Sequence, residues 1–166
     1  MRKEEKIALI RKSIQENRYP LQYQYLSYYK SSNCYSYAIG SKYVESESDD
    51  EYIYNLGCMS GLYPARNRLE AEKAFISDMD VIGINVRKSS FEEQLHEQEW
   101  KIAFFYDDYC VYFYDFHFAR QNADGSWSHQ EGIRRPIRCF EYSPEYCTDI
   151  ELLGYYILKV NKSNNY

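Results

Sequence analysis

The sequence lacks several features that would assign it to a common functional class. It has no apolar run long enough to cross a membrane, since the longest nearly apolar stretch is residues 152–158 and a membrane helix needs about 20 residues. It has no glycine-rich phosphate loop, no nucleotide-binding fingerprint and no internal repeat. It also lacks an excess of basic charge. The net charge of −5, from 20 basic and 25 acidic residues, argues against nucleic acid as a partner.

Paired cysteines are also missing. The chain has an odd number of cysteines and no C-x-x-C pair: Cys34, Cys58, Cys110, Cys139 and Cys147. The apolar stretch at residues 7–10 is too short for a signal peptide and is quickly followed by charge. We therefore expect a protein that is cytoplasmic as synthesised and keeps its thiols reduced, so that at least one thiol is available for chemistry.

Aromatic residues, by contrast, are abundant in a chain of modest length. The 166 residues predict a single domain, residues 1–166. They include 20 tyrosines, 8 phenylalanines and 2 tryptophans. A tyrosine buries a large ring while its hydroxyl remains a hydrogen-bonding group. We therefore expect a wide core with several wet, hydrogen-bonding edges.

Helical patterns come first along the chain. Isoleucines spaced at i, i+3 and i+7 predict an amphipathic helix over residues 3–17. An asparagine cap and a glycine stop predict a short helix over residues 33–40. Capping patterns predict two further helices over residues 67–79 and 90–99. The acidic run at residues 45–51 has no periodicity, and we interpret it as a solvated loop.

Strand patterns follow the helices. Residues 101–106 and 110–118 are rich in aromatic and branched side chains and predict an antiparallel hairpin. An Asp-Gly turn predicts a second hairpin across residues 120–129, and residues 152–160 predict a closing strand. Helices followed by a meander of strands indicate an α+β domain, with N-terminal helices packed on an antiparallel β-sheet.

Two of the three histidines flank the second predicted hairpin. His117 and His129 lie within about one residue pair of each other across the ladder, so they can share a hydrogen bond if the register puts both rings on one face. Cys34 is the candidate nucleophile, because a helix N-terminus favours the thiolate and lowers the pKa of the thiol. His117 would pair with the thiolate and later donate a proton, while His129 would orient the His117 ring.

Three motifs give the chain a resemblance to a known group. Residues 33–38 read NCYSYA, residues 115–121 read DFHFARQ and residues 125–129 read GSWSH. In this order they resemble bacterial papain-like proteins, and the Cys-His-His order is similar to that of NlpC-type cell-wall endopeptidases. The resemblance spans roughly residues 33–132 and implies a papain-like fold, with the cysteine and the two histidines named above as the triad.

The resemblance also implies how the domain is divided and what it does. Residues 1–32 form an N-terminal helical segment, residues 33–99 a helical half that carries the nucleophile, and residues 100–160 the antiparallel sheet. The implied activity is hydrolysis of an amide bond in a peptide, a protein or a peptidoglycan-like substrate. The reaction passes through a thioester at Cys34 and needs no cofactor.

Some features leave alternatives open. Asn33, Asp115 and Gln121 are secondary site candidates, and Gln121 or Asp124 is an alternative orienting group to His129. NlpC-type enzymes usually have a small residue after the nucleophile and are commonly exported, whereas this chain has Tyr35 and no export signal. These departures suggest a papain-like binding module without catalysis. Acyl transfer or deamidation by the same triad is a further alternative.

The remaining cysteines and histidine carry weaker signals. We interpret the four cysteines other than Cys34 as packing residues and His96 as solvated. A zinc site built from both site histidines, Cys139 and Cys147 matches no familiar ligand spacing, so we predict no metal. The sequence leaves the oligomeric state open.

Overall fold

The computed structural model describes residues 1–17, 33–46, 52–110, 113–133, 136–140 and 142–161. Its helices are α1 (Lys3–Asn17), α2 (Cys34–Ala38), α3 (Arg68–Val81) and the short 3-10 helix η3 (Pro144–Tyr146). Its strands are β1 (Ile84–Ser89), β2 (Glu99–Cys110), β3 (Phe113–Gln121), β4 (Trp127–Gln130), β5 (Ile137–Phe140) and β6 (Leu152–Val160).

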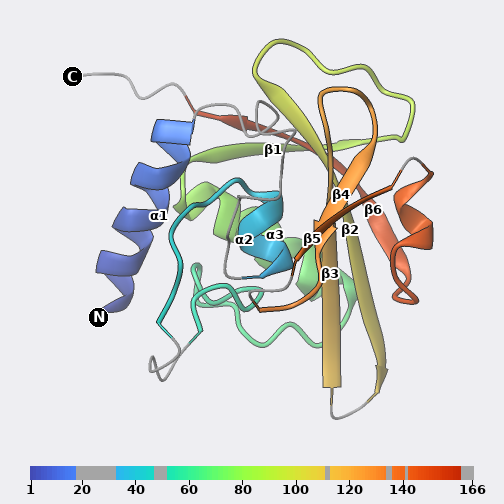
Figure 1. The fold of residues 1–166 in the computed structure, drawn as a ribbon. Helices are drawn as coiled ribbons and strands as arrows, with labels where there is room; N and C mark the ends of the chain where they lie inside the picture. The colour runs from blue at the N-terminus through green and yellow to red at the C-terminus, as the bar shows by residue number, and fades with distance from the viewer. Residues whose placement is uncertain (18–32, 47–51, 111–112, 134–135, 141, 162–166) are drawn as a thin grey trace.

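The described strands form one antiparallel sheet in the order β1-β6-β2-β3-β4-β5 (Figure 1). The three α-helices pack against it, α2 over β3 and β4 and α3 over β1 and β2. The predicted α+β class is therefore confirmed. Because side chains alternate along a strand, Phe104 and Phe118 face the helices, whereas Phe105 and Ala119 belong to a smaller cluster on the other face. That second face is covered in part by Cys147 and Ile150, from the segment after η3.

The predicted helices near the N-terminus form where the local patterns placed them. In α1, Ile10 and Ile14 are buried in the core that α2 and α3 share. Gly40, just after α2, has a φ of 77°, which is the left-handed stop expected there. The amide of Glu70 is capped by Asn67 at the start of α3. The rest of the predicted helical segment 1–32, residues 18–32, lies outside the described residues.

The predicted helix over residues 90–99 is wrong. Residues 90–98 are irregular, and β2 begins at Glu99. The ammonium group of Lys101, whose side chain is buried, donates hydrogen bonds to the backbone carbonyls of Phe91 and Glu93. In a helix these carbonyls would accept backbone hydrogen bonds. The contact with Lys101 therefore takes the place of the helix that the capping pattern predicted.

Two strands, β1 and β5, and the position of β6 in the sheet were not predicted from the sequence. β1 lies within the segment 33–99 that was expected to be helical, and β5 follows the second hairpin. β6 pairs with both β1 and β2, so the predicted closing strand lies inside the sheet rather than at its edge. Both predicted hairpins are present, as the β2–β3 and β3–β4 pairs, but the turn of the first was expected too early, because β2 continues through residues 107–110 and β3 begins at Phe113.

Glu45 corrects the interpretation of the acidic run as a solvated loop. Its side chain is buried against Lys6 of α1 and accepts the backbone N–H of Ile53 at 2.8 and 3.0 Å. The run therefore begins with a buried ion pair that joins α1 to the loop before α3. Residues 47–51 lie outside the described residues.

Aromatic side chains dominate the core between the sheet and the helices. The Tyr35 ring stacks on Phe118 with 4.8 Å between centroids, and Phe118 stacks on Phe104 at 4.4 Å. Phe75 of α3 packs against both phenylalanines at 5.3 and 5.5 Å. The Tyr35 hydroxyl donates to Asp78 at 3.0 Å, so the core combines large apolar rings with internal hydrogen bonds, as the composition suggested.

Asp78 is the polar centre of this core. Its carboxylate accepts the Tyr35 hydroxyl and the backbone amides of Gly57 and Ser60. We predict that Asp78→Ala lowers the free energy of unfolding by about 3 kcal/mol, because two buried donors and the half-buried amide of Ser60 lose their acceptor. Asp80→Ala on the same helix is the control, since Asp80 is exposed and should cost no more than about 0.5 kcal/mol. Urea unfolding of both variants tests this, and equal midpoints would contradict it.

Candidate functional site

Cys34 is the first residue of α2. Asn33 caps this helix: its Oδ1 accepts the Ser36 N–H at 3.0 Å, and the Ser36 hydroxyl accepts the Asn33 N–H at 2.9 Å. The Asn33 amide also donates to the carbonyl of Tyr54 at 3.2 Å. Asn33, a secondary site candidate, therefore fixes where the helix starts and thus where the Cys34 sulfur lies.

Hydrogen bonds connect α2 to β2 and to the two strands that carry the histidines, β3 and β4. The Tyr37 hydroxyl lies 2.6 Å from the hydroxyl of Ser128, directly before His129. The buried Arg120 guanidinium donates to the Tyr37 carbonyl and hydroxyl and lies 4.2 Å from its ring centroid. The Trp100 indole donates to the Ala38 carbonyl at 3.0 Å. The motif residues Tyr37, Arg120 and Ser128 thus hold α2 in place against the strands that carry the histidines.

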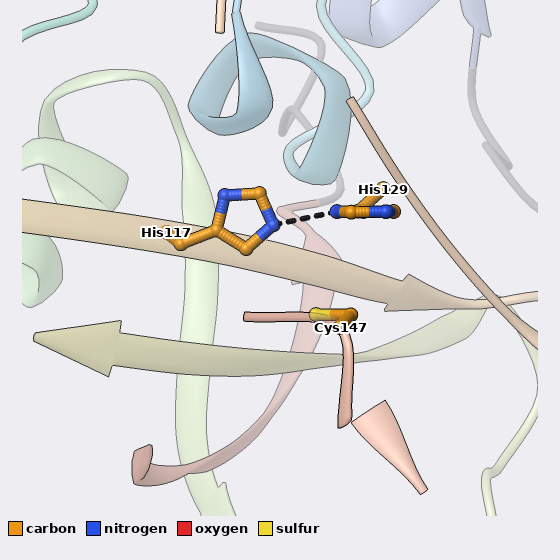
Figure 2. Close-up of side chains that lie close together, drawn as sticks. All are labelled: His117, His129 and Cys147. Atoms are coloured by element: carbon orange, nitrogen blue, oxygen red, sulfur yellow. Dashed lines mark hydrogen bonds between the residues drawn. The ribbon is translucent and has the colours of Figure 1, made fainter. Parts of the chain in front are cut away.

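His117 and His129 form a hydrogen-bonded pair. His129 pairs with Ala119 across the β3–β4 ladder, so it lies diagonally opposite His117 and both rings project from the same face. The Nε2 atom of His117 lies 2.8 Å from the Nδ1 atom of His129, and both side chains are buried (Figure 2). The predicted juxtaposition of the two histidines is therefore confirmed.

Cys34 and His117 line one cavity of about 390 Å³. The backbone amide of Phe118, the residue after His117, is directed at the Cys34 sulfur. The sulfur therefore lies beside β3 at Phe118, the residue that follows His117. His117 shares its face of β3 with Ala119, whereas Cys34 belongs to the core on the helix face, so the two residues reach the wall of this cavity from different faces of the sheet. The wall also includes Asp115, another secondary candidate, which is exposed.

The thiol of Cys34 does not have the low pKa expected from the sequence. Burial raises the pKa of Cys34 to about 12, and the nearby Asp115 carboxylate raises it further, while backbone amides of Phe118, Tyr35 and Cys34 itself act in the opposite direction. The prediction of a thiolate at Cys34 is therefore wrong. The helix α2 has only five residues and Cys34 is only 5% exposed, so the rise in pKa caused by desolvation exceeds the fall caused by the helix N-terminus. Burial also lowers the pKa of His117 to about 3.

The raised pKa gives a testable pattern of alkylation. We predict that iodoacetamide labels Cys34 about tenfold faster for each unit of pH between 7 and 10, with no plateau, because only the thiolate reacts. In urea the same thiol should reach a plateau above its ordinary pKa of about 8.5. Peptide mapping by mass spectrometry measures both rates. A plateau below pH 9 in the folded protein would show that the thiolate is already formed.

Tyr35 stands where NlpC-type enzymes usually have a small residue, but its side chain does not point into the cavity beside Cys34. Its ring is fully buried against Phe118 of β3 and Phe75 of α3, and its hydroxyl donates to Asp78. Tyr35 is thus a core residue, and the cavity wall beside Cys34 is left to other side chains, among them Asn55, Phe116 and Ile133.

The other orienting candidates lie away from the histidine pair. The Gln121 amide is directed at the Gly125 carbonyl in the hairpin turn, and Asp124 accepts from the backbone and hydroxyl of Ser126. Gln121 lines a different hollow together with His96, which is exposed as predicted. Among these candidates, His129 is the one that contacts His117.

Cys147 is the site residue that sequence reasoning missed. It was interpreted as a packing residue, but its sulfur lies within 4.8 Å of ring nitrogens of both His117 and His129 (Figure 2). Of the two cysteines in the zinc set considered from the sequence, Cys139 is exposed on β5 and is not part of this cluster. The sequence did group Cys147 with both histidines as possible zinc ligands. However, no motif around Cys147 indicates that it lies next to them. The side chain of Cys110 lies outside the described residues.

Comparison of the chain with protein-family models, with curated proteins and with solved structures finds no match. Among the described residues, no helix is both long and apolar enough to span a membrane. The site is therefore interpreted from its own geometry and chemistry.

Proposed function

We propose that the protein is a papain-like cysteine hydrolase that cleaves an amide bond with Cys34, His117 and His129. The observation that carries the proposal is that Cys34 and His117 share a cavity, while His117 is hydrogen-bonded through Nε2 to His129. This leaves Nδ1 of His117 to serve the thiol. The three side chains then have the order nucleophile, base and orienting group.

In the proposed reaction the thiol loses its proton as it attacks. His117 Nδ1 accepts the proton of Cys34 while the sulfur bonds to the carbonyl carbon of the substrate. The backbone amides of Phe118, Tyr35 and Cys34 stabilise the negative charge that develops on sulfur. Because burial keeps the resting thiol protonated, proton transfer accompanies attack instead of preceding it.

His129 acts on His117 and does not touch the substrate. Its Nδ1 accepts the Nε2–H of His117, which fixes the tautomer whose Nδ1 lone pair can take the thiol proton. His117 then donates that proton to the leaving amine, and a thioester remains at Cys34. A water molecule, deprotonated by His117, attacks the thioester carbonyl. The C–S bond breaks, the carboxylic acid is released, and His117 returns the proton to the Cys34 sulfur.

One observation favours a second candidate, a papain-like binding module. The same burial that raises the pKa of Cys34 leaves the sulfur with little nucleophilic character at rest. In this alternative the cavity binds a peptide or a peptidoglycan-like segment without cleaving it. Acyl transfer and deamidation differ from hydrolysis only in the leaving group and the acceptor.

Isotope labelling distinguishes these functions. The protein is incubated with a panel of peptides and soluble peptidoglycan fragments in H₂¹⁸O, and the products are analysed by mass spectrometry. Hydrolysis between residues gives a new carboxylate that carries one ¹⁸O, deamidation gives the same label with loss of ammonia, and acyl transfer gives an unlabelled conjugate. Binding of panel members without any product would refute the hydrolase and support the binding module.

A further inference from the structure

The imidazole pair and Cys147 form a second arrangement in the same region. Ring nitrogens of His117 and His129 and the sulfur of Cys147 all lie within 4.8 Å of one another. The histidines come from neighbouring strands, while Cys147 directly follows η3 and approaches the pair from the segment that covers this face of the sheet (Figure 2). The tertiary fold thus brings together three good metal ligands.

These atoms match the chemistry and spacing of a zinc site. Zinc prefers imidazole nitrogen and thiolate sulfur, at about 2.0–2.1 and 2.3 Å. Tetrahedral geometry then places two nitrogens about 3.3 Å apart and a nitrogen and a sulfur about 3.6 Å apart. His117 Nε2 and His129 Nδ1 are 2.8 Å apart, so a shift of about half an ångström opens the pair to this spacing.

Glu131 lines the same cavity as His117 and Cys147, although its carboxylate is not part of the cluster of ligand atoms. Its carboxylate acts electrostatically on both His129 and Cys147, and it lines the cavity beside them. Its partner Arg138 lies 3.9 Å away in an exposed ion pair, a type of contact that contributes little in water. Breaking this ion pair would therefore cost little, and the Glu131 carboxylate contributes negative charge to the cavity wall.

We propose that His117, His129 and Cys147 bind a divalent cation of the zinc class, with a water molecule as the fourth ligand. On binding, Cys147 releases its thiol proton to solvent and the sulfur donates an electron pair to the metal. The two ring nitrogens that face each other both direct lone pairs at the cation, so the hydrogen bond between the rings is lost. No oxidation or reduction takes place.

Metal binding would inhibit the proposed reaction. With Nε2 on the metal, the His117 proton resides on Nδ1, the atom that must accept the proton of Cys34. This consequence rests on the proposed function, whereas binding itself does not, because Cys34 is not among the ligands.

Cobalt and zinc titrations of the full chain test the site. We expect one Zn²⁺ per chain, and with Co²⁺ a near-ultraviolet absorption from thiolate-to-metal charge transfer. Cys147→Ser should remove this absorption and weaken zinc binding at least about tenfold. Cys139→Ser, which changes an exposed thiol outside the cluster, should leave both intact. Thermal unfolding confirms that each variant is folded, and Glu131→Gln provides a second variant with an expected smaller loss of affinity.

The outcomes separate this proposal from the catalytic one. Absence of zinc binding by the wild-type protein, or an unchanged cobalt spectrum in folded Cys147→Ser, would overturn the metal site. Cys34→Ala should bind zinc like the wild type, whether or not the protein is an enzyme. If the protein turns over substrate, zinc should inhibit the wild type at lower concentration than Cys147→Ser, each compared with its own rate in chelator.

Discussion

Cys34→Ala is expected to reduce turnover by about 10⁴-fold or more, to the level given by substrate binding alone. The variant removes the sulfur that forms the thioester in the proposed reaction. Substrate binding should survive, because the change deletes one atom from a cavity of about 390 Å³. Initial rates and equilibrium binding to the same substrate measure the two effects separately.

Cys58→Ala is the matched control for this experiment. Cys58 is also a buried cysteine, and it does not line the cavity. Its removal should leave the rate unchanged apart from a small loss of stability. If Cys34→Ala retained more than a tenth of the activity, the nucleophile would have to be sought elsewhere, with Cys147 as the next candidate.

His117→Ala is expected to reduce turnover about as strongly as the cysteine variant, because nucleophile and base act as one unit. The sharper expectation concerns the double variant. Cys34→Ala with His117→Ala should be no slower than either single variant, since each change alone already abolishes thioester formation. Rates measured for all three proteins with one substrate test this non-additivity.

His96→Ala controls for the loss of an imidazole, because His96 is exposed and lines a different hollow. It should retain full activity. Since His117 is buried, circular dichroism and thermal unfolding must first show that its variant is folded. Losses that multiply in the double variant would mean that His117 and Cys34 act in separate steps.

The elements with local patterns were predictable from the sequence. α1 follows its isoleucine spacing, α2 follows its asparagine cap, and the β3–β4 hairpin follows its Asp-Gly turn. This hairpin allowed the histidine pair to be predicted, because the position of the turn determines which residues lie opposite each other on the two strands. The order of helices and strands then indicated the fold class.

The rest depends on contacts between distant segments. Cys147 belongs to an irregular segment after η3, so its approach to the histidines follows from how that segment covers the sheet. The pKa of Cys34 depends on burial, which the capping pattern does not reveal. Likewise, Glu45 is buried through Lys6, 39 positions earlier, and no local pattern distinguishes it from a solvated acidic residue.

The most direct test of the account is to find which sulfur reacts in the folded protein. A peptide chloromethyl ketone, which alkylates thiols activated beside a histidine, is incubated with the wild type and with the folded His117→Ala variant, and the modified residue is located by peptide mapping. The account predicts a single adduct on Cys34 that forms far more slowly without His117. An adduct on Cys147, or one on Cys34 that forms equally fast in both proteins, would contradict it.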